Sequence, residues 1–157
     1  MKTTAKTALK RNKLSVPARW IMENRGLDDV LDYGCGKGDD VRHLDGMDGI
    51  VAGGWDPYHQ CDYLYRPGPD WGYSQVLCTY VANVLLDVAD RCDLYDRLAE
   101  YHEGGSDVYI TVRRDGKGKT ASQHFGVDPR DEHHAPWELI RETSQYAIYA
   151  LEDRYDG

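Results

Sequence analysis

The sequence predicts a three-layer α/β sandwich, in which helices cover both faces of a mostly parallel sheet. The chain has 157 residues, which is the size of one ordinary domain, and we expect residues 1–157 to form a single one. Short apolar runs bounded by glycine, proline and acidic residues alternate with segments of helical periodicity. Strands that alternate with helices form parallel sheets, because each crossover helix returns the chain to the same end of the sheet.

The first third of the chain is expected to hold two helices and two strands. Apolar residues at helical spacing predict a helix that begins after Ser15, a favoured N-cap residue type, and ends at Gly26. The short apolar runs over 28–33 (DDVLDY) and 50–55 (IVAGGW) predict buried strands. Between them, residues 39–44 (DDVRHL) begin another helix, with two acids near its positive N-terminus.

The rest of the chain continues the alternation. The expected elements are a strand over 74–81, a helix over 87–103, a strand over 107–113, a helix over 136–144 and a strand over 146–151. Proline, glycine and charged residues predict loops over 57–72 and 114–134, the second with a short strand.

Charge is distributed unevenly along the chain. Residues 1–26, the expected basic N-terminal helix, carry seven basic side chains and one acid, so residues 27–157 hold a net charge of −14 within a total of −8. A body this acidic repels a phosphate backbone, which argues against broad nonspecific binding of nucleic acid. The basic segment either contacts phosphates locally or pairs with the acidic body. No apolar run is long enough for a membrane span or a signal peptide, so we expect a cytoplasmic protein without a membrane partner.

The sequence does not predict a metal site. The four cysteines contain no CxxC pair, which argues against a zinc ribbon and a redox dithiol. His133 and His134 follow Asp131 and Glu132, and all four are metal-ligand types. Adjacent residues rarely converge on one ion, so we expect a solvated loop there.

One glycine-rich segment has the pattern of a ligand-binding turn. Residues 30–40 (VLDYGCGKGDD) place glycines at 34, 36 and 38 directly after an apolar strand and before a helix. Glycines there let the backbone turn sharply and approach a ligand that a Cβ would exclude. Asp56 ends the next strand, where a carboxylate can accept hydrogen bonds from both hydroxyls of a ribose.

Two nucleoside cofactors compete for this segment. A dinucleotide fingerprint, G-x-G-x-x-G, requires glycine at position 39, but Asp39 stands there and its charge would repel a pyrophosphate. Asp32, ahead of the glycines, suits a ligand with a positive end. S-adenosylmethionine has an ammonium, a sulfonium and a ribose, so the sequence favours it over NAD.

Three segments in this order resemble the class I S-adenosylmethionine-dependent methyltransferases: VLDYGCGKGDD, GWDPY and YSQVLCTYVANVLLD. The resemblance covers about residues 5–115 and extends to the entrance segment TALKRNKLSVPAR. It is strongest to small phage and bacterial members and to methyltransferases associated with DNA phosphorothioation. It implies a Rossmann-like class I methyltransferase fold with S-adenosylmethionine as cofactor.

The resemblance also implies which residues hold the cofactor. Asp32 would hold the methionine end, Asp56 the ribose hydroxyls and the glycine segment the underside of the cofactor. The full set of expected cofactor residues is Asp32, Gly34, Cys35, Gly36, Gly38, Asp56, Pro57 and Thr79. Only residues 57–73 separate the second segment from the third, which is too short for the strand and helix that many members have there. We therefore expect a trimmed sheet and a reduced adenine pocket.

The methyl acceptor is not identified by any motif. Residues 79–83 (TYVAN) lack the Asp/Asn-Pro-Pro-aromatic motif of amino-methyltransferases of adenine and cytosine, and no Pro-Cys pair exists for cytosine C5 methylation. The acceptor is therefore either a nucleic acid or a small molecule. Residues 113–134 are expected to cover the active site, with His124 as the first candidate base and Tyr80 and Asn83 as further catalytic candidates.

Arg113 and Arg114 end a strand at the edge where ligands bind, and such a pair could bind an acidic substrate. Two other functions stay open. The chain could be a non-catalytic S-adenosylmethionine-binding module that needs a partner subunit, or an NAD-dependent oxidoreductase, which Asp39 disfavours. Twelve tyrosines and four tryptophans would also suit an aromatic interface, so a homodimer is plausible.

Overall fold

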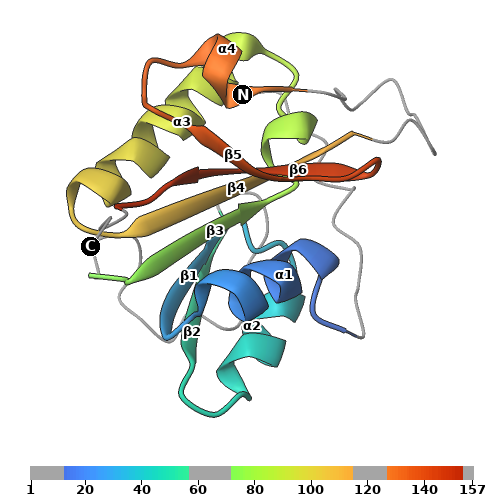
Figure 1. Cartoon of the computed structure of the whole chain (residues 1–157), viewed down its shortest axis with the longest axis vertical. Helices are drawn as coiled ribbons and strands as arrows, with labels where there is room; N and C mark the ends of the chain where they lie inside the picture. Colours follow the sequence, from blue (N-terminus) through green and yellow to red (C-terminus); the bar gives the residue numbers. More distant parts are fainter. Residues whose placement is uncertain (1–12, 57–71, 115–126, 154–157) are drawn as a thin grey trace.

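The computed structural model describes residues 13–56, 72–114 and 127–153. The strands are β1 (Asp29–Tyr33), β2 (Val51–Trp55), β3 (Gln75–Thr79), β4 (Asp107–Arg113), β5 (Glu138–Glu142) and β6 (Tyr146–Leu151). The helices are α1 (Val16–Arg25), α2 (Asp39–Asp45), the 3-10 turn η2 (Ala82–Val84), α3 (Val88–Glu103) and α4 (Pro129–Glu132). The sequence expectation of alternating strands and helices is confirmed (Figure 1).

The described strands form one sheet in the order β2-β1-β3-β4-β6-β5. Strands β1 to β4 run parallel, whereas β6 runs antiparallel to β4 and β5 antiparallel to β6. The chain passes from β1 outward to β2 and then returns to form β3 on the other side of β1. This reversal is a topological switch point, and in such sheets the carboxyl ends of the two strands diverge there and leave a crevice for a ligand.

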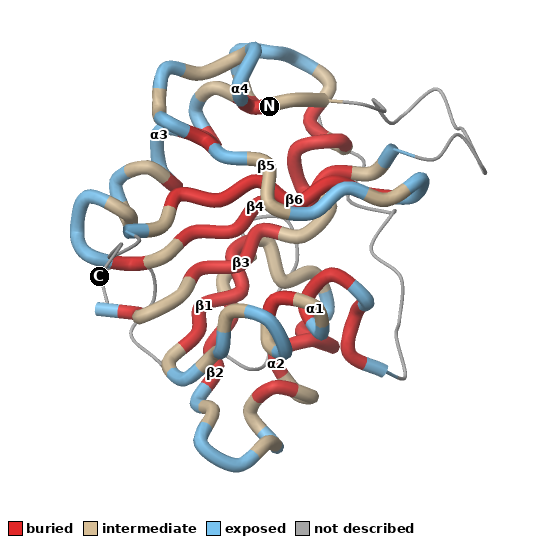
Figure 2. The backbone as a smooth tube through the Cα atoms, viewed as in Figure 1, coloured by how far each residue is buried: buried red, intermediate tan, exposed pale blue. Residues whose placement is uncertain are grey.

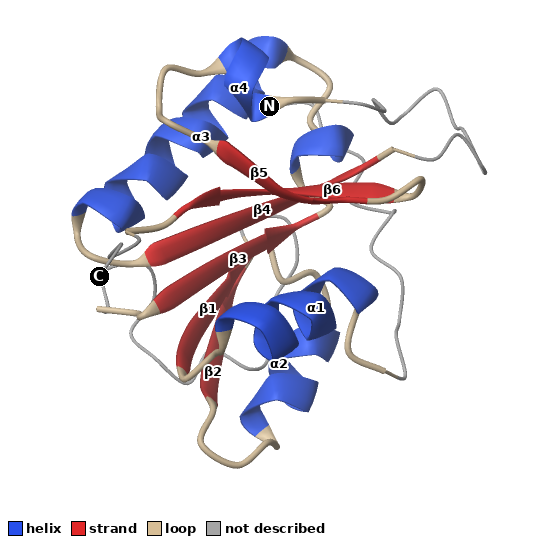
Figure 3. Cartoon of the chain, viewed as in Figure 1, coloured by secondary structure: helices blue, strands red, loops and turns tan. Residues whose placement is uncertain are grey.

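Helices cover both faces of the sheet, with α1 and α2 on one side and α3 and α4 on the other (Figures 1 and 3). Each face has its own apolar cluster, and neighbouring β4 residues divide between them: Val108 packs under α3, and Tyr109 packs on the side of α1 and α2. The central strands are buried on both faces (Figure 2), as a parallel sheet requires. The predicted mostly parallel three-layer α/β fold is therefore confirmed.

The entrance to α1 is tied to the start of α2. The Ser15 side chain caps α1 by accepting a hydrogen bond from the Ala18 N–H at 3.4 Å. The Ser15 N–H and hydroxyl donate to the two carboxylate oxygens of Asp40, at 2.8 and 2.6 Å. Both residues are buried. The N-cap expected at Ser15 and the helix end expected at Gly26 are confirmed, and Asp40 adds a cross-link that the sequence did not predict.

Two predictions of local structure are wrong. The segment 114–134 was expected to be a loop with a short strand, but its described part contains helix α4, which Asp128 caps by accepting a hydrogen bond from the Arg130 N–H. The segment 136–144 was expected to be a helix, but it contains strand β5, which pairs with β6 at the edge of the sheet. The strand expected over 74–81 is also shorter, because it ends at Thr79. The predicted loops over 57–72 and 114–134 fall mainly on residues outside the described ranges, so the expected trimming of the sheet is not tested by the structure. Among the described residues, no helix has the length and apolarity to cross a membrane.

Candidate functional site

The glycine segment lies at the switch point and takes a backbone conformation that glycine favours. Gly34, Gly36 and Gly38 have φ angles of +81°, +58° and +80°. A side chain in this left-handed region clashes with its own backbone, at a cost of about 1–2 kcal/mol per residue. Every second residue from the end of β1 to the start of α2 therefore requires glycine.

The segment is also packed tightly against the start of the next crossover. A Cβ placed on Gly34 would lie 2.4 Å from Cγ2 of Val81, which follows β3. The N–H groups of Gly34 and Cys35 donate to the carbonyl of Trp55 at the end of β2, at 2.6 and 3.2 Å. The loop is thus held from both sides, by the ends of β2 and β3.

Two carboxylates flank the loop. Asp56 Oδ2 accepts a hydrogen bond from the Gly36 N–H at 2.6 Å, so the residue expected to bind a ribose also fixes the loop itself. Asp32, one residue before the end of β1, is 5% exposed. Burial is the main cause that raises the pKa of the Cys78 thiol on neighbouring β3, and the charges of Asp32 and Asp56 raise it further. The structure therefore brings Asp32, the glycines and Asp56 together at one edge of the sheet.

Helix α2, which follows the glycine loop, helps to distinguish a dinucleotide from S-adenosylmethionine. Asp39, in the first turn of α2, is buried and forms an ion pair with Arg42. Its charge is partly compensated, so repulsion of a pyrophosphate is a weaker argument against a dinucleotide than the sequence suggested. The stronger argument is that a buried acid occupies the position of the third glycine.

Beyond the loop, the end of β3 carries an unusual residue. Tyr80 has a φ of +61° and is the single non-glycine residue in the left-handed region among the described ranges. Its N–H donates to the carbonyl of Thr111 on β4 at 2.9 Å, which holds the backbone in place. The guanidinium carbon of Arg113 lies 5.1 Å from the centre of the Tyr80 ring. Strained backbone of this kind concentrates at functional sites.

Two buried polar atoms lie near this point. Asn83 in η2 is 1% exposed and Thr111 on β4 is 0% exposed. Neither the Asn83 Oδ1 nor the Thr111 Oγ1 has a hydrogen-bond partner among the described residues. Thr111 is aligned with Thr79, the last residue of β3. Buried polar groups without partners are uncommon, and they favour a role in which a ligand or water supplies the missing bond.

Some of the remaining predicted site residues lie at this sheet edge, and others lie outside the described residues. Thr79 ends β3, Tyr80 follows it and Asn83 lies in η2, so all three are at the sheet edge where the glycine loop lies. Pro57 and His124 lie outside the described residues, so the adenine contact and the candidate base stay predictions. The contact of the Arg113 guanidinium with the Tyr80 ring was missed, although both residues were placed at strand ends. No sequence signal indicates a positive φ at a tyrosine.

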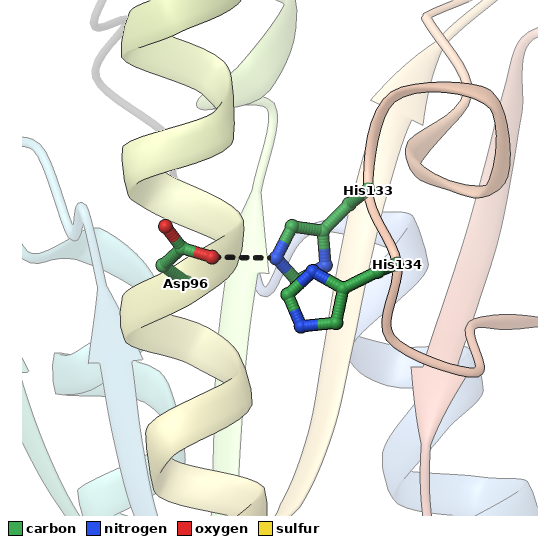
Figure 4. Close-up of side chains that lie close together, drawn as sticks. All are labelled: Asp96, His133 and His134. Atoms are coloured by element: carbon green, nitrogen blue, oxygen red, sulfur yellow. Dashed lines mark hydrogen bonds and ion pairs between the residues drawn. The ribbon is translucent and has the colours of Figure 1, made fainter.

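His134 is exposed in a bend, as expected of a solvated loop, but His133 is not solvated. The His133 side chain is 3% exposed, and its Nε2 lies 2.7 Å from Oδ1 of Asp96 on α3 (Figure 4). Ligand atoms of Asp96, His133 and His134 all lie within 4.8 Å of one another, which is a spacing compatible with a cation. Glu132, next in sequence, pairs with Arg91 instead.

The hydrogen bonds of His133 argue against metal binding. Its Nδ1 accepts from the Ala135 N–H at 3.3 Å and from the Trp137 indole N–H at 3.2 Å. A nitrogen that faces two donors must be unprotonated, so the ring proton lies on Nε2 and is donated to Asp96. A metal-bound histidine has the reverse arrangement, with its second nitrogen donating to an acceptor. This cluster therefore fits a structural hydrogen-bond network better than a cation site.

A buried ion pair fixes α4 to α3. Arg91 is 8% exposed and donates from Nε and Nη2 to the Glu132 carboxylate, at 3.0 and 2.7 Å. Its Nη1 donates to the carbonyl of Leu85 at 2.9 Å, and the Tyr95 hydroxyl donates to Glu132 Oε1 at 2.9 Å. The hydrogen bond to Glu132 raises the pKa of Arg91. A bidentate pair with further hydrogen bonds to both partners is a strong cross-link.

Solved structures, a methyltransferase among them, share this architecture. The magnesium protoporphyrin IX methyltransferase of Synechocystis PCC 6803 with bound S-adenosylhomocysteine (SAH) matches with a TM-score of 0.53 at 14% identity, over 85% of this chain and 78% of that one. The same enzyme with bound S-adenosylmethionine (SAM) matches with a TM-score of 0.51 at 16% identity, over 85% and 74%. A structure from work on the conversion of a disulfide bond into a thioacetal group during echinomycin biosynthesis matches with a TM-score of 0.51 at 17% identity, over 85% and 81%.

The chain has their fold. No protein-family model matches the sequence, and no curated protein matches it either.

Proposed function

We propose that this protein is a methyltransferase that uses S-adenosylmethionine. The observation that carries the proposal is the glycine loop at the switch point, with three left-handed glycines and with Asp56 bound to the Gly36 N–H. Likeness of fold alone would not distinguish a methyltransferase from other nucleoside-binding proteins. The loop and its two carboxylates make that distinction, because they fit a cofactor with positive groups and without phosphates.

The residues present fit this cofactor chemically. Asp32 is a buried carboxylate beside the loop and would accept hydrogen bonds from the ammonium of the methionine end. Asp56 would accept from the ribose hydroxyls, since a carboxylate has about four acceptor positions and the Gly36 N–H uses one. When bound, the cofactor supplies an electrophilic methyl group on a sulfonium. The chain's part is to orient that group toward the nucleophile and to exclude water.

The methyl acceptor would bind at the same edge of the sheet as the cofactor, on the side where β3 ends. Thr79 at the end of β3, together with Tyr80 and Asn83 beyond it, would separate the cofactor from the acceptor. His124 is proposed as the base if the nucleophile carries a proton. The relation to phage, bacterial and phosphorothioation-associated members, a cytoplasmic location and assembly as a homodimer or with a partner subunit are also part of this proposal. Their support is the sequence alone.

Calorimetric titration with SAM, SAH and NADH tests the cofactor. We expect SAM and SAH to bind, NADH not to bind, and Asp56→Ala to weaken SAH binding at least about tenfold, or about 1.4 kcal/mol. Asp45→Ala is a matched control, because Asp45 Oδ1 also accepts a backbone N–H, that of Ala52 at 3.2 Å near the other end of β2. Binding of NADH instead of SAH, or an equal loss in both variants, would contradict the assignment.

Methyl transfer is then tested with radiolabelled SAM against DNA, RNA and a small-molecule extract. Label that appears in any fraction supports an enzyme. Binding of SAH without transfer to any fraction would instead favour a non-catalytic binding module that needs a partner.

A further inference from the structure

Helix α2 begins directly after the glycine loop, residues 34–38, and has little stability of its own. It spans seven residues, Asp39–Asp45, and its N-cap residue, Gly38, provides no side-chain hydrogen bond. Helices shorter than about 12 residues are marginal in water, because few hydrogen bonds offset the cost of the first turn. The start of α2 therefore depends on contacts with the rest of the molecule.

Ser15, at the start of α1, supplies such a contact. Its N–H and its hydroxyl donate to the two carboxylate oxygens of Asp40, in the first turn of α2, at 2.8 and 2.6 Å. The Ser15 hydroxyl oxygen also accepts from the Ala18 N–H, so one side chain caps α1 and holds α2. Hydrogen bonds to a carboxylate are about twice as strong as those between neutral groups, and a buried carboxylate that loses them is costly. This Ser15–Asp40 cross-link joins the starts of two helices on the same face of the sheet (Figure 3).

The start of α2 is connected by hydrogen bonds to the rest of the glycine loop. The Gly38 carbonyl accepts from the Arg42 N–H at 3.0 Å, which ties the last residue of the loop into the helix. The Gly38 N–H donates to the Cys35 carbonyl at 2.9 Å, which closes a tight turn. Gly36 lies within that turn, and its N–H donates to Asp56. A shift of the first turn of α2 would therefore move the backbone that would face the cofactor.

The other contacts of α1 do not depend on the Ser15–Asp40 cross-link. Ala18 and Ile21 are fully buried in the apolar cluster on that face of the sheet. In the last turn of α1, the Arg25 Nε donates to both carboxylate oxygens of Glu152, at 3.1 and 3.2 Å. Loss of the cross-link should therefore free only the start of α1, while the rest of the helix stays docked.

We infer that the Ser15–Asp40 cross-link couples the docking of the start of α1 to cofactor binding by the glycine loop. Ser15 and Asp40 are positioning residues, because they act on the cofactor through the backbone of residues 36–38. By thermodynamic linkage, docking raises the affinity for the cofactor by the same factor by which the cofactor stabilises the docked state. The inference rests on the proposed function, because the ligand of the loop is the proposed cofactor.

Calorimetric titration with SAH tests the coupling at the loop. The wild type is titrated first, and absence of SAH binding there would refute the proposed function together with the inference. With binding established, we expect Ser15→Ala to weaken it by about tenfold. The matched control is Ser106→Ala, because Ser106 is also buried and its hydroxyl donates to the Tyr73 carbonyl at 2.6 Å. Ser106 precedes β4 and so lies at the opposite end of the sheet, and its replacement should leave the SAH affinity unchanged.

Amide hydrogen exchange, followed by NMR in the unaltered protein, is a readout that a merely structural role would not change. We expect SAH to slow exchange of the Ser15 N–H by about tenfold more than exchange of the Ser106 N–H, which donates to the Tyr101 carbonyl at 3.0 Å. The comparison removes any general stabilisation of the fold, because that would slow both amides equally. It needs no substitution, so it stays decisive if Ser15→Ala does not fold.

Two kinds of result would overturn the inference. The first is an equal SAH affinity in the wild type and Ser15→Ala, or an equal loss of affinity in Ser15→Ala and Ser106→Ala. The second is SAH binding that slows exchange at Ser15 and Ser106 to the same extent.

Discussion

Replacement of Gly34 by alanine tests how the glycine loop is held at the end of β3. The residue has a φ of +81°, and an added Cβ would lie 2.4 Å from Cγ2 of Val81. The conformation costs an alanine about 1–2 kcal/mol, and insertion of a methyl group into a packed site costs about 1–3 kcal/mol more. We therefore expect Gly34→Ala to lower the free energy of unfolding by about 2–5 kcal/mol. The loss is within the stability of an ordinary domain, so the variant should still fold.

Gly26→Ala separates the two costs. Gly26 has the same φ of +81°, but a Cβ there would have no atom within 4 Å. Its ψ of 144° lies outside the left-handed helical region, so this control should lose about 1–3 kcal/mol, from conformation alone. Urea unfolding of both variants shows how large a loss arises at a glycine that has no packing contact.

A double-mutant cycle with Val81→Ala measures the contact between positions 34 and 81. In the Val81→Ala background, Cγ2 is absent and Gly34→Ala should cost little more than Gly26→Ala does. We expect a coupling energy of about 1–3 kcal/mol between positions 34 and 81. A coupling below about 0.5 kcal/mol would refute the reasoning, because such a value is within the additivity of independent sites. SAH affinity, measured on the same variants, should fall with Gly34→Ala and recover in part in the double variant.

Two further predictions concern buried hydrogen bonds. Burial is the main cause that raises the pKa of Tyr95 and Tyr109 above the ordinary 10.0, and the hydrogen bonds of Tyr95 to Glu132 and of Tyr109 to Glu152 raise it further. Because the pKa is higher in the folded state, these two tyrosines contribute fully to the free energy of unfolding below pH 10, and this contribution is lost as the pH rises further. Tyrosinate absorbance should show both ionising only on unfolding, and their ionisation in the folded protein would count against this. If His133 is structural, an excess of Zn²⁺ should not raise the urea midpoint of unfolding. His133→Ala should lower the free energy of unfolding by about 2–3 kcal/mol, because it removes these buried hydrogen bonds. Stabilisation by Zn²⁺ would contradict the assignment of the ring proton to Nε2 of His133.

Local features of the sequence predicted the fold and the glycine loop well. Gly34, Gly36 and Gly38 take conformations that depend on their own backbone, so their spacing after an apolar strand was sufficient. The cap at Ser15 was predicted for the same reason.

Features that depend on distant residues were not predicted. The segment around β5 has the composition of a helix, and the bulge between Leu139 and Arg141 hides the alternation of a strand. Its pairing with β6 overrides local propensity. His133 meets Asp96, and Ser15 meets Asp40, across long stretches of sequence that carry no signal of these contacts.

The cross-link between Arg91 and Glu132 has a consequence for how such a protein can change over evolution. Residues 115–126 join Arg113, held in β4, to α4, held against α3 by that ion pair. Both of these anchors make their contacts outside the segment that joins them, so substitutions within that segment leave the described contacts of β4 and α4 in place. Under the proposed function, exchange of this one segment would change the acceptor preference without altering the glycine loop.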